Sequence, residues 1–117
     1  MRVLIADDSS LVRERLSAAL SEIEGVEIVG QTPDAQLAVD FVRRLSPEVV
    51  IMDIRLRGGN EIDALRTIKR GDPAPIVLVF TNYTLAEYRE KCMDAGADFF
   101  FAKSSEFKTM LKTLRAF

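Results

Sequence analysis

The chain has 117 residues and a formal net charge of −2, and 48% of its residues are hydrophobic while 29% are charged. This length fits one domain with one hydrophobic core, and the balance of residues is that of a globular protein, which excludes disordered and fibrous classes. The sequence pI near 5.2 lacks the basic excess that nucleic-acid phosphates require, so no direct contact with nucleic acid is expected.

The single cysteine and the N-terminal segment indicate a location in the cell. Cys92 has no partner for an internal disulfide and is interpreted as a small buried residue in a reducing compartment. Charged residues interrupt the apolar stretch at the N-terminus, so no signal peptide is predicted, and no apolar run is long enough to cross a membrane. We therefore expect a cytoplasmic protein without membrane insertion.

The first part of the chain alternates short apolar runs with an amphipathic segment. The run 2–6 predicts a strand, and apolar residues three to four positions apart over 11–23 predict a helix. Gly25 is predicted to end this helix in a left-handed cap. A second strand is predicted at 26–30.

The next helix has a clear predicted entrance. Thr32 is expected to be its N-cap, with Pro33 at the first helical position and Asp34 placed favourably for the helix dipole. An apolar stripe over 35–45 follows, and a third strand is predicted at 49–52.

Caps mark the third and fourth helices. Asn60 is predicted to cap the third helix, which stops at Gly71 before a fourth strand at 76–80. Thr84 and Glu87 have the spacing of a capping box, which predicts the start of the fourth helix.

Gly96 is predicted to close that helix, followed by a strand over 97–102 and an amphipathic helix over 107–117. Strict alternation of strands and helices predicts right-handed crossovers and a doubly wound parallel α/β sheet with helices on both faces. Because no linker, repeat or low-complexity segment interrupts the pattern, we interpret residues 1–117 as one domain without an effector domain.

Ligands of such sheets bind beyond the carboxyl ends of the strands. The polar residues predicted to lie at those ends are Asp7, Asp8, Asp53, Thr81 and Lys103. Three carboxylates at one place repel each other unless a cation lies among them, and hard oxygen ligands favour Mg²⁺. Because Mg²⁺ combines one or two carboxylates with phosphate oxygens, this set of residues indicates phosphoryl chemistry.

The acidic pair in IADDSS, the Asp in VVIMDIRL, the Thr in LVFTN and the Lys in GADFFFAK resemble the receiver domain of two-component response regulators. The resemblance covers the whole chain and is to single-domain, chemotaxis-regulator-like receivers. It implies a flavodoxin-like fold, with a five-stranded parallel sheet in the order 2-1-3-4-5 flanked by five helices.

Matched residue by residue, the resemblance implies a role for each position of the site. Asp53 is then the phosphoacceptor. The ligands of Mg²⁺ are Asp7, Asp8, Asp53 and the backbone carbonyl of Arg55. The residues that contact the phosphoryl group or respond to it are Lys103, Thr81 as the switch hydroxyl, and Phe100 as the switch aromatic.

The resemblance further implies a phosphorylation-dependent signalling switch of a two-component or phosphorelay system. A histidine kinase or a histidine phosphotransfer protein donates the phosphoryl group, and the face formed by the fourth helix, fifth strand and fifth helix then signals to a downstream protein. No enzymatic activity is expected beyond self-catalysed phosphotransfer and autodephosphorylation. The identity of the kinase, the target and the oligomeric state stay open.

Several positions depart from the usual receiver pattern. Ser104 follows the lysine where receivers commonly have proline, and a cis peptide without proline costs about 2.5–4 kcal/mol, so a cis bond is not assumed there. Arg55 and Arg57 follow the acceptor, where their guanidinium groups could hold phosphate oxygens, shield the anhydride from water or face solvent. With Asn82, which is bulkier than usual, they are predicted to tune the lifetime of the phosphorylated state.

The same residues also fit other interpretations. Taken singly, each residue fits a turn, a strand end or a solvated charge, whereas their joint occurrence at successive strand ends favours a site. A haloacid-dehalogenase-like hydrolase would need a D-x-D motif after the first strand, where this chain has adjacent acids. A pseudo-receiver that binds partners without phosphorylation is the alternative, although all the key positions are intact. Phe100, between Phe99 and Phe101, fits either core packing or a partner face.

Overall fold

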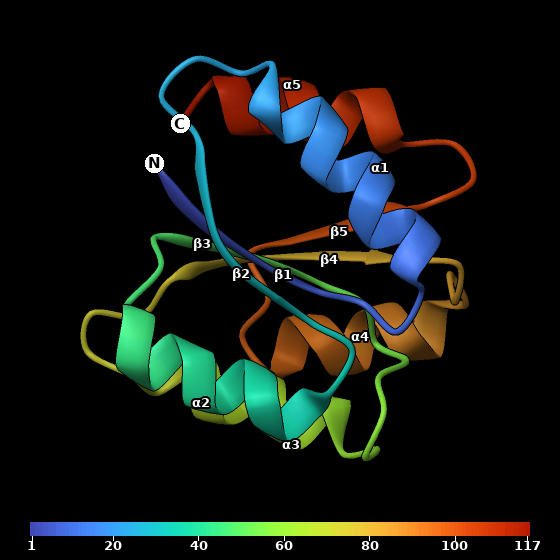
Figure 1. Cartoon of the computed structure of the whole chain (residues 1–117). Helices are drawn as coiled ribbons and strands as arrows, with labels where there is room; N and C mark the ends of the chain where they lie inside the picture. Colours follow the sequence, from blue (N-terminus) through green and yellow to red (C-terminus); the bar gives the residue numbers. More distant parts are fainter.

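The computed structural model describes residues 1–117 and alternates five strands with five helices (Figure 1). The strands are β1 (Arg2–Ala6), β2 (Glu27–Thr32), β3 (Val49–Met52), β4 (Ile76–Thr81) and β5 (Phe99–Ala102). The helices are α1 (Ser10–Ser21), α2 (Ala35–Leu45), α3 (Glu61–Lys69), α4 (Ala86–Asp94) and α5 (Phe107–Arg115). Each predicted strand and helix is therefore present, with small differences at the ends.

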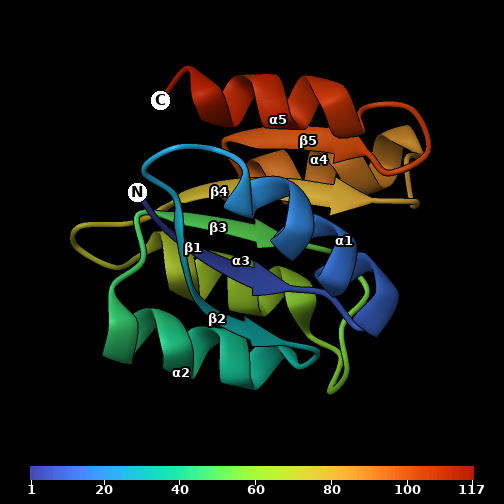
Figure 2. The same cartoon turned by 45° about the horizontal axis from the view of Figure 1, so that its top comes forward.

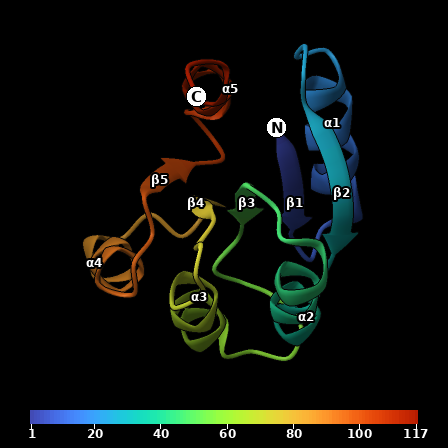
Figure 3. The same ribbon diagram turned by 90° about the vertical axis from the view of Figure 1, so that its left-hand side faces the viewer.

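The strands form one parallel sheet in the order β2-β1-β3-β4-β5, and their arrows point the same way in Figure 2. Helices α1 and α5 cover one face of the sheet, and α2, α3 and α4 cover the other (Figure 3). This is the flavodoxin-like doubly wound fold predicted from the sequence. None of the helices combines the length and hydrophobicity needed to span a membrane.

Two hydrophobic cores lie on opposite faces of the sheet, which explains the continuous apolar runs of the strands. In β1, Leu4 and Ala6 point into the core under α2, α3 and α4, whereas Val3 and Ile5 point into the core under α1 and α5. All four residues are fully buried. A strand covered on both faces has no solvent side, so its sequence does not alternate between apolar and polar residues.

The predicted N-cap of the second helix is wrong by two residues. Thr32 is the last residue of β2, where its carbonyl accepts a hydrogen bond from the N–H of Asp7 at 3.0 Å. The cap is Asp34, which has extended backbone angles and accepts a hydrogen bond from the N–H of Leu37 at 3.0 Å. Thr32 remains part of the sheet because its backbone already pairs with β1. The carboxylate of Asp34, a stronger acceptor, caps the helix instead.

The predicted capping box at the fourth helix is also wrong. The helix begins one residue later than the spacing requires, with Leu85 at the cap position and no side-chain cap bond, and Thr84 and Glu87 are exposed. Asn60 does precede the third helix, but in a left-handed conformation without a side-chain cap bond. Gly96 follows α4 with a φ of +109°, as predicted for a residue that ends a helix.

Candidate functional site

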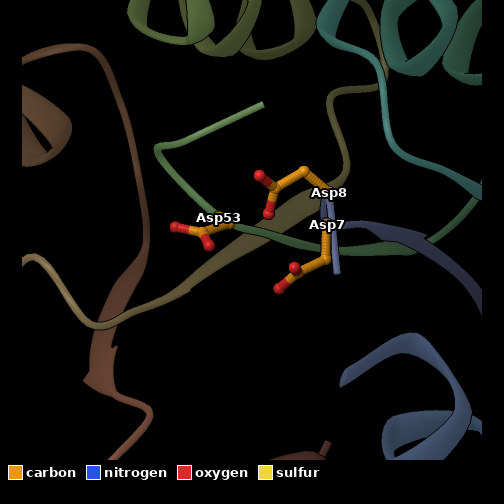
Figure 4. A group of neighbouring side chains, drawn as sticks. All are labelled: Asp7, Asp8 and Asp53. Atoms are coloured by element: carbon orange, nitrogen blue, oxygen red, sulfur yellow. The ribbon is translucent and has the colours of Figure 1, made fainter. Parts of the chain in front are cut away.

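The site lies where the carboxyl ends of two adjacent inner strands meet. Asp7 and Asp8 follow β1, Asp53 follows β3, and the three carboxyl groups come together beyond the sheet (Figure 4). One carboxylate oxygen from each residue lies within 4.8 Å of the other two. Asp7 and Asp53 are only 2% and 4% exposed, whereas Asp8 faces solvent. The sequence prediction that these acids converge is confirmed.

Lys103 provides the counter-charge of this cluster. Its Nζ lies 2.7 Å from Oδ2 of Asp7 and 2.7 Å from Oδ2 of Asp53, so one ammonium group bridges both buried carboxylates. The lysine side chain is itself only 11% exposed. Three carboxylates and one ammonium still leave net negative charge in the site, which a divalent cation would neutralise.

Burial and hydrogen bonding shift the pKa values of two of these groups. Burial raises the pKa of the Asp7 carboxyl above its ordinary value, although hydrogen bonds from Lys103 and from the N–H of Ser9 oppose the shift. Burial alone would lower the pKa of Lys103, but its hydrogen bonds to Asp53 and Asp7 outweigh this effect and raise it. The lysine is therefore charged at neutral pH.

Backbone N–H groups orient both buried carboxylates. Oδ1 of Asp7 accepts a hydrogen bond from the N–H of Ser9 at 2.9 Å, and Oδ1 of Asp53 accepts one from the N–H of Arg55 at 3.2 Å. In each case the donor lies two residues further along the chain, the geometry of an Asx turn. The two carboxylates are therefore held in the same way, with one oxygen on the backbone and the other on Lys103.

Thr81 ends β4 and is fully buried. Its hydroxyl oxygen accepts a hydrogen bond from the N–H of Tyr83 at 3.1 Å, and its carbonyl accepts one from the N–H of Lys103 at 2.9 Å. The threonine thus lies at the same edge of the sheet as the acidic cluster, on the next strand after Asp53. Its predicted role as the switch hydroxyl stays a prediction.

Phe100 belongs to the core and not to an exposed surface. It is 8% exposed, packs in the core under α2 to α4, and has the Arg89 guanidinium over its ring at 5.5 Å. Phe99 and Phe101 point to the opposite face of the sheet, where their rings stack with centroids 5.9 Å apart. Of the two interpretations left open, core packing describes Phe100, and its role as the switch aromatic stays a prediction.

The three positions predicted to tune the lifetime differ in their surroundings. The guanidinium of Arg55 lies 4.6 Å from the centroid of the Tyr83 ring. Arg57 is exposed, and its backbone instead pairs with the β2–α2 loop, donating to the carbonyl of Pro33 at 2.9 Å. Asn82 is exposed. The peptide between Lys103 and Ser104 is trans, since the cis peptide bond of the chain is Asp72–Pro73.

Tyr83 was not singled out from the sequence. Its N–H donates a hydrogen bond to the hydroxyl oxygen of Thr81, and its ring makes a cation–π contact with the guanidinium of Arg55. Tyr83 therefore joins the loops that follow β3 and β4. A signal existed, because Tyr83 lies two residues after Thr81 just as Arg55 lies two residues after Asp53. Equal offsets on adjacent parallel strands place side chains near each other.

Comparison with known proteins identifies the family. The chain matches the model of the response regulator receiver domain over residues 3–115. The chain belongs to this receiver-domain family. It is 31% identical over 115 residues to the response regulator GacA of Pseudomonas aeruginosa, covering 98% of this chain and 54% of GacA. It is 37% identical over 113 residues to the transcriptional regulatory protein PdtaR of Mycobacterium tuberculosis, covering 97% and 54%.

Solved receiver structures have the same fold. The response regulator domain of Thermotoga maritima CheB superimposes with a TM-score of 0.83 at 28% identity, covering 97% of this chain and 90% of that one. A LuxR-family response regulator from Aurantimonas gives a TM-score of 0.89 at 30% identity, covering 98% and 82%. The chain spans about half the length of the relatives GacA and PdtaR.

Receiver domains are signalling domains that are phosphorylated by histidine kinases and act on downstream targets, and they bind Mg²⁺ at an acidic pocket. Asp7, Asp8 and Asp53 form an acidic cluster whose residue types and spacing could hold a metal ion. Membership of this family also removes the haloacid-dehalogenase-like hydrolase as an alternative.

Proposed function

We propose that this chain is a phosphorylation-dependent switch of a two-component or phosphorelay system, with residues 1–117 forming one receiver domain and Asp53 accepting the phosphoryl group. The observation that carries the proposal is the buried Asp53 carboxylate, bound to Lys103 at 2.7 Å inside a cluster of three acids. Asp53 is only 4% exposed and lies beside two other carboxylates, an arrangement that lowers the stability of the fold. A purely structural role gives no reason for this loss of stability.

Mg²⁺ fits the residues of the site. Asp7, Asp8 and Asp53 supply hard oxygen ligands, and the carbonyl of Arg55 would add a backbone ligand. When bound, the cation supplies positive charge that offsets the charge on the transferring phosphoryl oxygens. The net negative charge left by Lys103 in the cluster is the observation that supports a divalent cation.

Asp53 is prepared as a nucleophile by its surroundings. The N–H of Arg55 fixes Oδ1 at 3.2 Å, so the carboxylate has one orientation toward an incoming donor. An oxygen of Asp53 attacks the phosphorus of a phosphohistidine, the aspartyl O–P bond forms, and the histidine N–P bond breaks. The histidine nitrogen leaves with the electron pair, and Lys103 exchanges a carboxylate contact for a phosphoryl oxygen.

The signal then follows from the added charge. A phosphoryl group brings about one and a half to two negative charges and new acceptor oxygens. The Thr81 hydroxyl turns its hydrogen toward a phosphoryl oxygen and donates to it, and Phe100 repacks within its core. These movements change the face formed by α4, β5 and α5, to which a downstream protein binds. Hydrolysis of the aspartyl phosphate returns the switch to its first state.

The partners follow from the same chemistry. The donor is a histidine kinase or a histidine phosphotransfer protein, and the output is a contact with another protein in the cytoplasm. The net charge of −2 gives no overall basic excess for binding nucleic acid. The chain's own chemistry is limited to accepting the phosphoryl group and losing it to water.

Intact mass after incubation with acetyl phosphate and Mg²⁺ tests this proposal. The wild-type protein should gain one phosphoryl group, the gain should disappear with EDTA, and Asp53→Asn should gain none. Asp94→Asn, which changes an exposed carboxylate on α4, is the matched control and should gain the group normally. A wild-type protein that gains nothing from acetyl phosphate or from a panel of phosphorylated histidine donors would support the pseudo-receiver alternative.

A further inference from the structure

The loop that carries Lys103 is closed by Glu106. The N–H of Glu106 donates to the carbonyl of Ala102 at 2.8 Å, and Oε1 of Glu106 accepts a hydrogen bond from the N–H of Ala102 at 2.9 Å. Both polar groups of Ala102 are therefore bound to the same residue, four positions later. Lys103 is the first residue inside this closed loop.

The position of β5 explains why this closure matters. β5 is an edge strand, and on its inner side the N–H of Lys103 donates to the carbonyl of Thr81 at 2.9 Å. Because successive N–H groups of a strand point in opposite directions, the N–H of Ala102 points to the open edge, where no strand can accept it. The carboxylate of Glu106 takes the place of that missing strand.

Glu106 also occupies a position for which other residues are better suited. It is the N-cap of α5, yet its side chain makes no cap bond to the helix. Ser, Thr, Asp and Asn are the preferred caps, and the first turn of α5 has no acidic residue. The glutamate side chain binds the N–H of Ala102 instead of capping its own helix, which indicates a role in the loop.

The rest of the loop adds only one long hydrogen bond, from the N–H of Ser105 to the carbonyl of Ala102 at 3.4 Å. Ser104 and Ser105 are exposed, and neither has a ring to fix its backbone φ. The direction in which Lys103 leaves β5 therefore depends on the hydrogen bonds at either end of the loop. That direction decides whether the ammonium reaches Asp7 and Asp53, both 2.7 Å away.

We propose that Glu106 is a positioning residue for Lys103: its carboxylate, bound to the N–H of Ala102, holds the loop so that Nζ lies between Asp7 and Asp53. The consequence for phosphoryl transfer rests on the proposed function, whereas the consequence for the position of Lys103 does not. A displacement of about 1 Å in a reacting group can slow a reaction by up to about a hundredfold.

Three substitutions separate this role from helix capping. Glu106→Gln keeps an acceptor oxygen at the same reach, Glu106→Ala removes it, and Glu106→Asp supplies a preferred helix cap that is too short to reach Ala102. A merely structural cap predicts that Glu106→Asp performs as well as the wild type. Positioning of Lys103 predicts instead that Glu106→Asp is as defective as Glu106→Ala. Ser105→Ala, an exposed neighbour in the same loop, is the control.

The first readout is the NMR signal of the Lys103 ammonium, whose protons exchange slowly only while they are held between the two carboxylates. We expect the signal in the wild type, Glu106→Gln and Ser105→Ala, and its loss in Glu106→Ala and Glu106→Asp. Exchange of the Ala102 amide should accelerate in the same two variants. An unchanged Lys103 signal in Glu106→Asp, with the Ala102 amide exposed to exchange, would overturn the proposal.

The second readout is the rate of phosphorylation by acetyl phosphate with Mg²⁺. Glu106→Ala and Glu106→Asp should be slower by roughly ten- to a hundredfold, while Glu106→Gln stays within about twofold. If wild type and variants alike gain no phosphoryl group while the Lys103 signal behaves as predicted, the proposed function fails and the positioning role stands. If all variants react at the wild-type rate, the positioning role fails and the proposed function stands.

Discussion

The inner strands and the edge strand of the site hold their functional side chains in different ways. On the inner strands β1, β3 and β4, Asp7, Asp53 and Thr81 each have one side-chain oxygen that accepts a hydrogen bond from a backbone N–H two residues later. On the edge strand β5, the ammonium group of Lys103 has the two buried acids themselves as its partners. The inner side chains are held by backbone, whereas the lysine that faces them is held by contacts that can be exchanged.

This difference separates a fixed frame from a movable donor. Backbone bonds within a turn persist while the strands persist, so the acid cluster keeps its geometry in every state of the site. An ammonium group can exchange one acceptor for another without rearranging the sheet. The edge strand therefore provides both the compensating charge and a donor that can follow a phosphoryl group.

Removal of the compensating charge should have the largest effect. Lys103→Ala leaves two buried carboxylates without their shared cation, and we expect the free energy of unfolding to fall by about 3–5 kcal/mol. Urea unfolding at neutral pH without divalent cations measures this, and added Mg²⁺ should restore part of the loss. Lys108→Ala, at an exposed position of α5, is the control and should change little. A loss no larger than the control's would mean that the acids do not need Lys103.

A smaller effect on stability is expected for the hydrogen bonds of Asp98, which stabilise the sheet without contacting the site. Oδ2 of Asp98 accepts hydrogen bonds from Nζ of Lys69 at 2.7 Å and from the N–H of Val77 at 2.8 Å. Asp98→Ala should lower the free energy of unfolding by about 1–3 kcal/mol and leave the phosphorylation rate unchanged. Asp98→Asn, which keeps an acceptor for Val77, should lose less. Slower phosphorylation in a folded Asp98→Ala protein would mean that this network also affects the site.

The sequence predicted the fold because its main signal is physical and repeated. Each strand is buried on both faces and each helix presents an apolar stripe, so the element order follows from hydrophobic patterns. The site residues followed from the same pattern, because Asp7, Asp53 and Thr81 mark strand ends in a sheet whose ligand edge is known.

What the sequence did not predict depends on contacts of single residues. The cap at Asp34 instead of Thr32 was decided by the pairing of Thr32 with β1, which no local pattern encodes. The stacking of Arg55 on Tyr83 joins two loops far apart in the chain. The bond from Ala102 to Glu106 is local, but it appears only once β5 is known to be an edge strand.

The pH dependence of stability should reveal the cost of burying the inner acids. Because burial raises the pKa of Asp7 above 3.8, its contribution to stability is complete below that pH and is lost as the pH rises through the raised value. The raised pKa of Lys103 has no effect in this range, since its contribution is lost only above 10.5. Asp7→Asn should therefore become progressively more stable than the wild type from about pH 4 to pH 7.

Urea midpoints measured across this range without divalent cations test that expectation. Mg²⁺ should reduce the difference at neutral pH, because a bound cation compensates the charge of Asp7 in the wild type. Asp40→Asn, which changes a partly exposed acid on α2 outside the site, is the matched control for the substitution itself. A difference between Asp7→Asn and the wild type that is independent of pH would show that burial does not govern this carboxyl.

The smallest expected effect concerns the contact that joins the loops after β3 and β4. A cation–π contact at an exposed site contributes about 0.5–1 kcal/mol, which corresponds to roughly a two- to fivefold change in a rate. Because Arg55 and Tyr83 lie on the loops that flank Asp53 and Thr81, their stacking should keep water from the aspartyl phosphate. Arg55→Ala and Tyr83→Leu should each shorten the lifetime of the phosphorylated state by that factor.

Decay of the phosphorylated form after removal of the donor measures the effect. Tyr83→Phe keeps the ring and should decay at the wild-type rate, and the double variant of Arg55→Ala and Tyr83→Leu should decay no faster than either single variant. Arg57→Ala and Asn82→Ala test the other two positions predicted to tune the lifetime, and we expect smaller effects there, since Arg57 pairs through its backbone and Asn82 faces solvent. Equal decay in all variants would mean that these side chains do not tune the lifetime, and that the loops after β3 and β4 act independently.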